Sequence, residues 1–298
     1  MYDLDLHTGK QLPLGRPLNK EQFMNKLICD DQAQAKPFLR WAGSKRSSIP
    51  KLADNSPESF NRYIEPFVGS AALFFHLSPK QSILSDLNPE LINLYKQMKE
   101  RPNELHSEFT RIPRDKETYY SIRSRLSGKL SDFDRAIFML YLNRNCFNGL
   151  YRTNKAGLFN VPYASAGRGG YPSADDFISC SERLQSANVV CSDFQSLIKA
   201  EVRSGDFVYL DPPYIKSSGR IFSEYVKGHF AHQDMGRLSD TLRLIHDRGA
   251  YFLLSFIEDE IAHDLVKEWG AETYLVQRNI SGFSSGRRKS SEIIIKNW

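Results

Sequence analysis

The sequence predicts an α/β fold in which a mostly parallel sheet is interrupted by a second, more polar region. Residues 63 to about 100 alternate between short apolar runs and amphipathic segments, a pattern typical of strand, helix, strand, helix. The same alternation returns from Asp193 onward. Between these stretches, residues 100–172 are charged and then rich in Gly, Asn, Arg and Tyr, so we expect an inserted region there.

The first predicted strand ends in a turn, Glu65-Pro66-Phe67-Val68-Gly69-Ser70, that leads into an apolar helix start. Gly69 would let the backbone approach a ligand closely, and the helix N-terminus favours a negative group. Phe67 is suited to pack against a cation such as a sulfonium. A plain strand-to-helix turn also needs a glycine, so this turn alone does not establish a cofactor site.

The second predicted strand, residues 82–85, ends at Asp86, and Asn88-Pro89-Glu90 then opens a helix. An acidic residue about 20 positions after a glycine turn suits the two hydroxyls of a ribose. Helix capping is the alternative role for Asp86. The sequence has neither a complete G-x-G-x-x-G nor a Walker P-loop, which disfavours a dinucleotide or nucleotide-triphosphate site.

The inserted region has two helical patterns, residues 112–126 and a stronger amphipathic one at residues 132–142, before a run too polar for a core. Asn148-Gly149 predicts a β-hairpin tip, with residues 159–163 as the returning strand. Hairpins can enter a DNA major groove, where Arg reads guanine and Asn reads adenine. Phe147 is placed to wedge into a base stack. An ordinary solvated loop is the alternative.

Two later strands also end at candidate site residues. Residues 188–191 precede Asp193-Phe194, which could bind an adenine amine and face or could be a turn beside a core ring. Residues 207–210 precede Asp211-Pro212-Pro213-Tyr214. Two prolines stiffen this turn, and the carboxylate, the carbonyls and the ring suit a planar amino-substituted ring.

The remaining pattern predicts helices near residues 234–247 and 258–268, a strand at 251–255, and a final strand pair at 273–277 and 292–296. Arg287-Arg288-Lys289 forms a cationic loop between the last two strands, suited to phosphate contact. Residues 1–36 form a polar N-terminal arm with one short helical pattern at residues 21–27 and no assignable role.

Composition is that of an ordinary globular protein, with 298 residues, 41% hydrophobic and 25% charged. A net charge of +5 suits a polyanionic partner without requiring one. We expect no membrane span, because no apolar stretch is long enough, and no secretory signal, because the first residues are acidic and polar. The 4 scattered cysteines give neither a metal site nor a disulfide framework, so we expect a reducing, intracellular setting.

Several of these blocks occur in the order found in one enzyme family. The chain resembles the Dam-type DNA adenine-N6 methyltransferases of the α subgroup over nearly all of residues 37–298. The blocks that carry the resemblance are residues 38–46, 63–69 and 85–92, residues 144–152 and 159–163, and Asp211-Pro212-Pro213-Tyr214.

The resemblance implies a Rossmann-like methyltransferase sheet, residues 37–90 and 173–298, with an inserted, mostly helical target-recognition domain at residues 91–172. It implies S-adenosylmethionine as cofactor, held by Trp41, Lys45, Glu65, Pro66, Phe67, Gly69, Asp86, Asp193, Phe194 and Asp211. Asp211, Pro212, Pro213 and Tyr214 would be catalytic. The residues expected at DNA are Arg144, Phe147, Asn148, Leu150, Arg152, Asn154, Pro162, Arg287, Arg288 and Lys289.

The implied function is methylation of adenine N6 in a short duplex site, with GATC as the leading candidate, after the base is flipped out of the duplex and without a metal. A cytosine-N4 or RNA-base methyltransferase and a non-catalytic DNA-binding regulator remain alternatives. Expected partners are double-stranded DNA and, as a candidate, a cognate restriction endonuclease, with a monomer acting on DNA in the cytoplasm, near the nucleoid. The chain departs from the family where Ser70-Ala71 replaces glycine in the cofactor turn.

Overall fold

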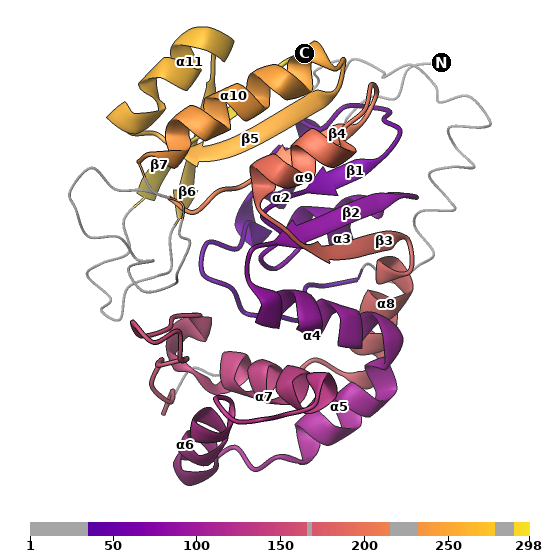
Figure 1. Cartoon of the computed structure of the whole chain (residues 1–298), viewed down its shortest axis with the longest axis vertical. Helices are drawn as coiled ribbons and strands as arrows, with labels where there is room; N and C mark the ends of the chain where they lie inside the picture. Colours follow the sequence, from indigo (N-terminus) through magenta and orange to yellow (C-terminus); the bar gives the residue numbers. More distant parts are fainter. Residues whose placement is uncertain (1–34, 166–168, 215–229, 231, 278–288) are drawn as a thin grey trace, which may run out of the picture. The chain divides into compact units, whose positions relative to one another are not determined.

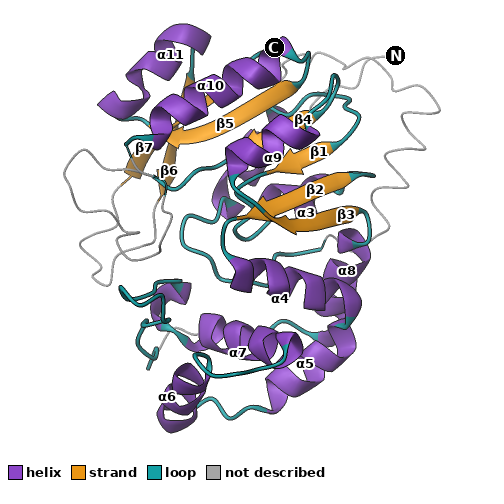
Figure 2. Ribbon diagram, in the orientation of Figure 1, coloured by secondary structure: helices purple, strands orange, loops and turns teal. Residues whose placement is uncertain are grey.

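One sheet organises the protein (Figures 1 and 2), seen in a computed structural model that describes residues 35–165, 169–214, 230, 232–277 and 289–298. Its seven strands have the order β3-β2-β1-β4-β5-β7-β6. The strands are β1 Tyr63–Glu65, β2 Ser82–Asp86, β3 Ala187–Cys191, β4 Phe207–Leu210, β5 Tyr251–Ile257, β6 Glu272–Gln277 and β7 Lys289–Lys296. β3, β2, β1, β4 and β5 are parallel, and β7 is antiparallel to both of its neighbours. The predicted α/β fold is confirmed.

Helices cover both faces of this sheet. The elements that follow or precede the strands are η1 Arg46–Ser48, α2 Ile49–Asp54, α3 Ala72–Leu77, α4 Pro89–Glu100, α5 Pro102–Arg111, α6 Lys116–Arg125, α7 Asp132–Asn145, η2 Phe147–Gly149, α8 Ala174–Leu184, α9 Phe194–Glu201, α10 Asp234–Asp247, η3 Glu260–Ala262 and α11 His263–Trp269. Alternate strand residues face opposite sides: Phe207 and Tyr209 pack with α2 to α8, and Val208 packs with α9 to α11.

Local sequence explains how the site end of α4 is built. Asn88 caps the helix, because its side-chain oxygen accepts from the backbone N–H groups of Glu90 (3.0 Å) and Leu91 (3.3 Å). Pro89 occupies the first helical position, where a missing N–H costs nothing. The predicted helix start is therefore confirmed, and it fixes the chain immediately after Asp86.

The helix predicted at residues 132–142 exists but is not amphipathic. In α7 every residue from Ala136 to Asn143 is buried, and the helix continues to Asn145. It is enclosed because α4, α5 and α6 all pack against it. The hydrophobic core runs without interruption from the sheet through α4 to α7, so the boundary expected at residue 91 falls inside α4. The division into two domains stays a prediction.

Residues 146–164, here called the recognition segment, differ from the predicted hairpin. Asn148 and Gly149 do have positive φ (55° and 64°), but they form the short helix η2 at the start of the segment, so the predicted tip is wrong. The chain reverses instead at Asn154, whose carbonyl accepts from Gly157 N (2.9 Å). Two isolated antiparallel bridges, Cys146 with Tyr163 and Thr153 with Phe159, replace a continuous ladder.

Candidate active site

The turn after β4 places Asp211 in a chain of polar contacts. Asp211 Oδ1 accepts from Lys45 Nζ at 2.7 Å and from Ser255 Oγ at 3.0 Å. Since the Ser255 hydroxyl gives its proton to Asp211, the Tyr209 hydroxyl 3.0 Å away donates to Ser255. Burial raises the pKa of Asp211, and the Lys45 ammonium opposes that effect without cancelling it. The result is an oriented hydrogen-bond acceptor at the carboxyl end of the strand.

Lys45 links this carboxylate to the ring of Tyr214. The Lys45 ammonium, whose side chain is only 6% exposed, lies 4.6 Å from the centre of the Tyr214 ring. The ring of Phe256 meets Tyr214 edge-on at 5.6 Å. Pro212 is buried and Pro213 exposed. An amine that enters beside Asp211 and Tyr214 would therefore share the carboxylate with Lys45.

The glycine turn after β1 is closely packed. Gly69 has a φ of 44°, and a side chain there would meet the Trp41 indole at 3.0 Å. The Gly69 N–H points to Asp86 Oδ2 at 3.4 Å, and its carbonyl accepts from the Tyr95 hydroxyl at 2.9 Å. Ala71 also adopts a left-handed conformation, with a φ of 53°. A residue other than glycine in this conformation carries some backbone strain.

Three carboxylates from neighbouring strands gather at this edge of the sheet. Glu65 ends β1, Asp86 ends β2, and Asp211 follows β4. Burial raises the pKa of Asp86 to about 6, against hydrogen bonds from Asn88 N and Gly69 N. Burial also raises the pKa of Glu65 well above its usual range, and the charges of Asp211 and Asp86 add to this, whereas the hydroxyl of Tyr63 lowers it. Such a cluster fits a ligand with hydroxyls, an amine and a positive charge.

Aromatic side chains lie next to these carboxylates at the same edge of the sheet. The rings of Phe67 and Phe194 lie 5.2 Å apart, and both contact Phe230. Asp193 caps α9 and accepts from Arg237 Nη2 at 2.6 Å. Burial raises the pKa of Asp193, but the bond from Arg237 and the capping N–H groups outweigh it, so the pKa is lowered. Phe194 is buried, which matches the alternative role of Asp193-Phe194 as a turn beside a core ring.

The expected cofactor and catalytic residues thus come together at the carboxyl ends of β1 to β4, with Pro66 buried in the turn. The expected DNA residues behave differently from one another. Phe147, Asn148 and Pro162 are exposed, whereas Leu150 and Arg152 are half-buried. Arg152 Nε donates to Asn160 Oδ1 at 2.8 Å.

Arg144 and Asn154 are largely engaged within the protein. The Arg144 guanidinium donates to the carbonyls of Phe38 and Gly170, and burial lowers its pKa to about 10. This placement favours a bracing role over the expected DNA contact. The Asn154 carboxamide oxygen accepts from Ala156 N and Leu158 N at the loop tip. Lys289 begins β7 and is not in a loop, while Arg287, Arg288 and residues 1–34 lie outside the described residues.

Sequence reasoning missed the residues that support the site. Ser255 and Tyr209 back Asp211, and Arg237 holds Asp193. A serine within the apolar strand β5 was a usable signal, because a buried hydroxyl needs a partner. Arg237 had no signal, since it lies on a helix far from Asp193 in sequence.

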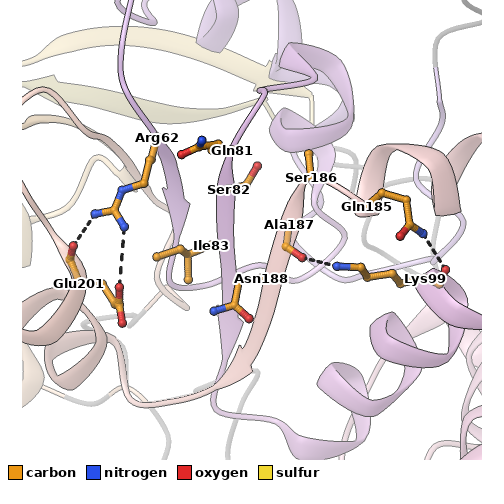
Figure 3. Close-up of a pocket in the computed structure, with 10 residues that line it drawn as sticks. All are labelled: Arg62, Gln81, Ser82, Ile83, Lys99, Gln185, Ser186, Ala187, Asn188 and Glu201. Carbon is orange, nitrogen blue, oxygen red and sulfur yellow. Dashed lines mark hydrogen bonds and ion pairs between the residues drawn. The ribbon is translucent and has the colours of Figure 1, made fainter.

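A shallow pocket lies at the opposite, amino ends of the strands (Figure 3). Its charged groups are already paired: Lys99 Nζ donates to the carbonyl of Ala187 at 2.7 Å, and Arg62 Nη2 to that of Glu201 at 2.5 Å. Its lining residues are Arg62, Gln81, Ser82, Ile83, Lys99, Gln185, Ser186, Ala187, Asn188 and Glu201. Because these groups are already bonded within the protein, the pocket is a weaker candidate for a ligand site than the carboxylate edge, the end of the sheet that carries Glu65, Asp86 and Asp211.

Two further structural findings concern the described part of the chain. It contains no group of three or more His, Cys, Asp or Glu side chains arranged to hold a metal ion. No helix in it is both long enough and apolar enough to cross a membrane.

Comparisons with known proteins identify a family for the chain. Residues 41–280 match the family model for D12 class N6 adenine-specific DNA methyltransferases. A type II methyltransferase of Lactococcus lactis subsp. cremoris is 37% identical over 91% of this chain and 99% of its own length. A DNA adenine methylase of Vibrio cholerae is 32% identical over 86% of this chain and 94% of its own length.

Solved structures are less similar. A putative methyltransferase of Streptococcus mutans, solved with SAH, is 10% identical, with a TM-score of 0.34 over 84% of this chain. The assignment therefore depends on the family model, the curated relatives and the Asp211 turn. On those grounds, the chain belongs to the D12 class of N6 adenine-specific DNA methyltransferases.

Proposed function

We propose that this adenine-specific DNA methyltransferase uses S-adenosylmethionine and acts on an adenine that has been flipped out of a short duplex site. The observation that carries the proposal is the Asp211 carboxylate, fixed by Lys45, Ser255 and a Pro-Pro turn beside the Tyr214 ring. Chemistry on a base requires the base to leave the stack, and a carboxylate beside a ring suits an extruded amino-purine.

The main chemical difficulty is the target nitrogen, whose lone pair is conjugated with the purine ring. Hydrogen bonds from its N–H groups to Asp211 and to the Pro212 carbonyl would localise that lone pair on nitrogen. The cofactor, when bound, supplies an electrophilic methyl group. The Asp211 carboxylate would stabilise the positive charge that grows on the target nitrogen during transfer, until a proton on that nitrogen is released to solvent.

The residues at the carboxylate edge fit that cofactor. Asp86 would accept from the ribose hydroxyls, and Glu65 would face the amino and carboxylate end together with the Gly69 turn. Trp41, which packs against Gly69, would line the cofactor site beside that turn. Asp193 and the Phe67–Phe194 pair would receive the adenine, with Arg237 keeping the Asp193 carboxylate in place.

The recognition segment would supply the DNA contacts. Its exposed residues Phe147, Asn148 and Pro162 and the half-buried Leu150 and Arg152 carry this part of the proposal. GATC is the proposed site, read by a monomer. The type II name of the Lactococcus lactis relative supports a search for a cognate restriction endonuclease.

Digestion of treated DNA to nucleosides tests the proposal. The protein is incubated with methyl-labelled cofactor and unmethylated DNA, with an Asp211→Ala variant as control. We expect label in N6-methyladenine at a single short site. Label in N4-methylcytosine would replace the base assignment, and DNA binding without transfer would support a non-catalytic regulator.

A further inference from the structure

Tyr151 lies between the recognition segment and the proposed cofactor site. Its ring stacks on the Trp41 indole, with ring centres 5.7 Å apart and planes 21° apart. Its other neighbour is Phe159, on the returning limb of the same segment, at 5.7 Å. Trp41 in turn covers Gly69, where an added side chain would meet the indole at 3.0 Å. Tyr151 therefore packs on Trp41, the residue that covers the glycine turn.

The hydroxyl of Tyr151 contacts the other side of the same site. It hydrogen-bonds with the side chain of Asn88, while burial raises the pKa of Tyr151 to about 12. The Asn88 oxygen already caps α4, so its amide group is the part available to Tyr151. The backbone N–H of Asn88 donates to Asp86 Oδ1 at 3.0 Å. Tyr151 thus contacts both Trp41 and Asn88, the residue that bonds Asp86.

The backbone that carries Trp41 is also held by the region around the recognition segment. Asn143 Oδ1 accepts from Arg40 N at 3.0 Å, and Asn143 Nδ2 donates to the Arg40 carbonyl at 2.5 Å. Gly149 lies so close that a side chain there would come within 2.4 Å of Arg40 Cβ. A shift of the recognition segment must therefore move the loop that bears Trp41 and Lys45.

We propose that Tyr151 is a positioning residue that couples DNA binding to cofactor binding. This inference rests on the proposed function. Leu150 and Arg152, on either side of Tyr151, are the residues expected to face DNA. When DNA fixes them, it also fixes the Tyr151 ring against Trp41 and Asn88, so the cofactor site is ordered before the cofactor arrives. By linkage, bound cofactor strengthens DNA binding by the same factor.

Titration with S-adenosylhomocysteine, which binds without turnover, tests the coupling. Its Kd is measured by calorimetry with and without a duplex that the wild-type protein methylates. For wild type we expect the duplex to lower the Kd about fivefold or more, the usual lower range for coupled sites. Tyr151→Leu should bring that ratio close to one, and Tyr151→Phe, which keeps the stack but loses the Asn88 bond, should give an intermediate ratio.

Tyr163→Phe is the matched control. It deletes one hydroxyl from the same segment, the donor to the carbonyl of Arg114 at 2.7 Å, and should keep the wild-type ratio. A wild-type ratio near one, or an unchanged ratio in both folded Tyr151 variants, overturns the coupling. If Tyr151→Leu does not fold, Tyr151→Phe decides. A wild-type protein that methylates no duplex refutes the proposed function instead, which is a separate result.

Discussion

Two aspartates at the two ends of β4, Asp206 buried and Asp211 half-buried, have opposite surroundings. Asp206, before the strand, is 1% exposed and accepts from Arg62 Nε (3.1 Å), Arg62 Nη2 (2.6 Å) and Arg203 N (2.8 Å). Asp211, after the strand, is 19% exposed and takes one lysine and one hydroxyl, both on the same oxygen. Its burial keeps the pKa raised, so its charge is only partly compensated.

This difference is the one expected between a structural carboxylate and the proposed catalytic carboxylate of Asp211. A bidentate arginine satisfies Asp206 and leaves it little to offer a ligand. Asp211 keeps acceptor capacity at an edge where Glu65 and Asp86 also have raised pKa values. Carboxylates whose negative charge is only partly compensated are concentrated at this end of the sheet, as is typical of functional sites.

The largest expected effect is on stability. Asp206→Ala leaves Arg62 without its main partner, so we expect the free energy of unfolding to fall by about 3–5 kcal/mol. Urea titration measures it. The control is Arg243→Ala, which breaks an exposed bidentate pair with Glu268 (2.7 and 2.8 Å) and should lower the free energy of unfolding much less. Equal losses in the two variants would contradict the contrast between the ends of β4.

Asp211→Ala should act on turnover instead. Loss of a transition-state contact of this kind lowers kcat by about 100-fold or more. Single-turnover methylation assays measure it, with circular dichroism to check the fold. Ser255→Ala removes one hydrogen bond of about 1 kcal/mol to the same carboxylate, together with the acceptor of the Tyr209 hydroxyl, and should lower kcat by roughly fivefold. Near wild-type turnover in Asp211→Ala would rule out the proposed role.

Asp86→Ala should weaken cofactor binding by roughly 1.5–3 kcal/mol and leave DNA binding nearly unchanged. Donation from ribose hydroxyls favours the ionised carboxylate. Because the pKa of Asp86 is about 6, cofactor affinity should be highest above pH 6 and fall as the pH drops below it. Calorimetry between pH 5 and 8 measures this, and Asp86→Asn should flatten the curve. Unchanged affinity in both variants would leave Asp86 with only its contacts to Gly69 N and Asn88 N.

The same residue has the opposite effect on folding. Burial raises the pKa of Asp86 in the folded chain to about 6, above its ordinary value of 3.8. Ionisation above pH 6 therefore costs folding free energy, and this cost disappears as the pH falls toward 4. Asp86→Asn should raise the stability of the ligand-free protein at pH 7 but not at pH 4. A stabilisation that is equal at both pH values would contradict the raised pKa.

The smallest effect concerns sequence preference. Arg152→Ala should relax discrimination at one base pair by about 1–3 kcal/mol, as measured by methylation of all single-base variants of the preferred site. Asn160→Ala, which removes the side-chain acceptor of the Arg152 guanidinium, should give a weaker form of the same change. If activity falls by one common factor at every site, Arg152 contacts only phosphate.

Short stretches of sequence were sufficient to predict the structure wherever a single strand, helix or turn determines it. The apolar runs predicted every strand of the sheet, and Asn88-Pro89 predicted the start of α4. The turn containing Asp211 was identifiable because two prolines after an apolar run have few structural alternatives. Charged residues at strand ends then fall on one edge of a parallel sheet.

Predictions from short stretches of sequence failed where packing against elements distant in the sequence determines the structure. α7 is buried on all sides because α4, α5 and α6 surround it, and no window of its own sequence shows them. Asn148-Gly149 predicted a hairpin tip, but these residues form η2, where Gly149 packs on Arg40. Arg144 and Arg152 have the same side chain, yet only the fold shows that Arg144 is enclosed by backbone carbonyls.

The position of β7 has a consequence for how a nascent chain reaches this fold. β7 is the last strand, yet it inserts between β5 and β6, and it is the neighbour with which β6 pairs in the described sheet. Until Lys296 has left the ribosome, β5 exposes an unpaired apolar edge whose interior includes Ser255, the support of Asp211. Exposed strand edges of this kind promote aggregation of incomplete chains. The sheet, including the β5 edge beside Ser255, is therefore complete only after β7 has been synthesised.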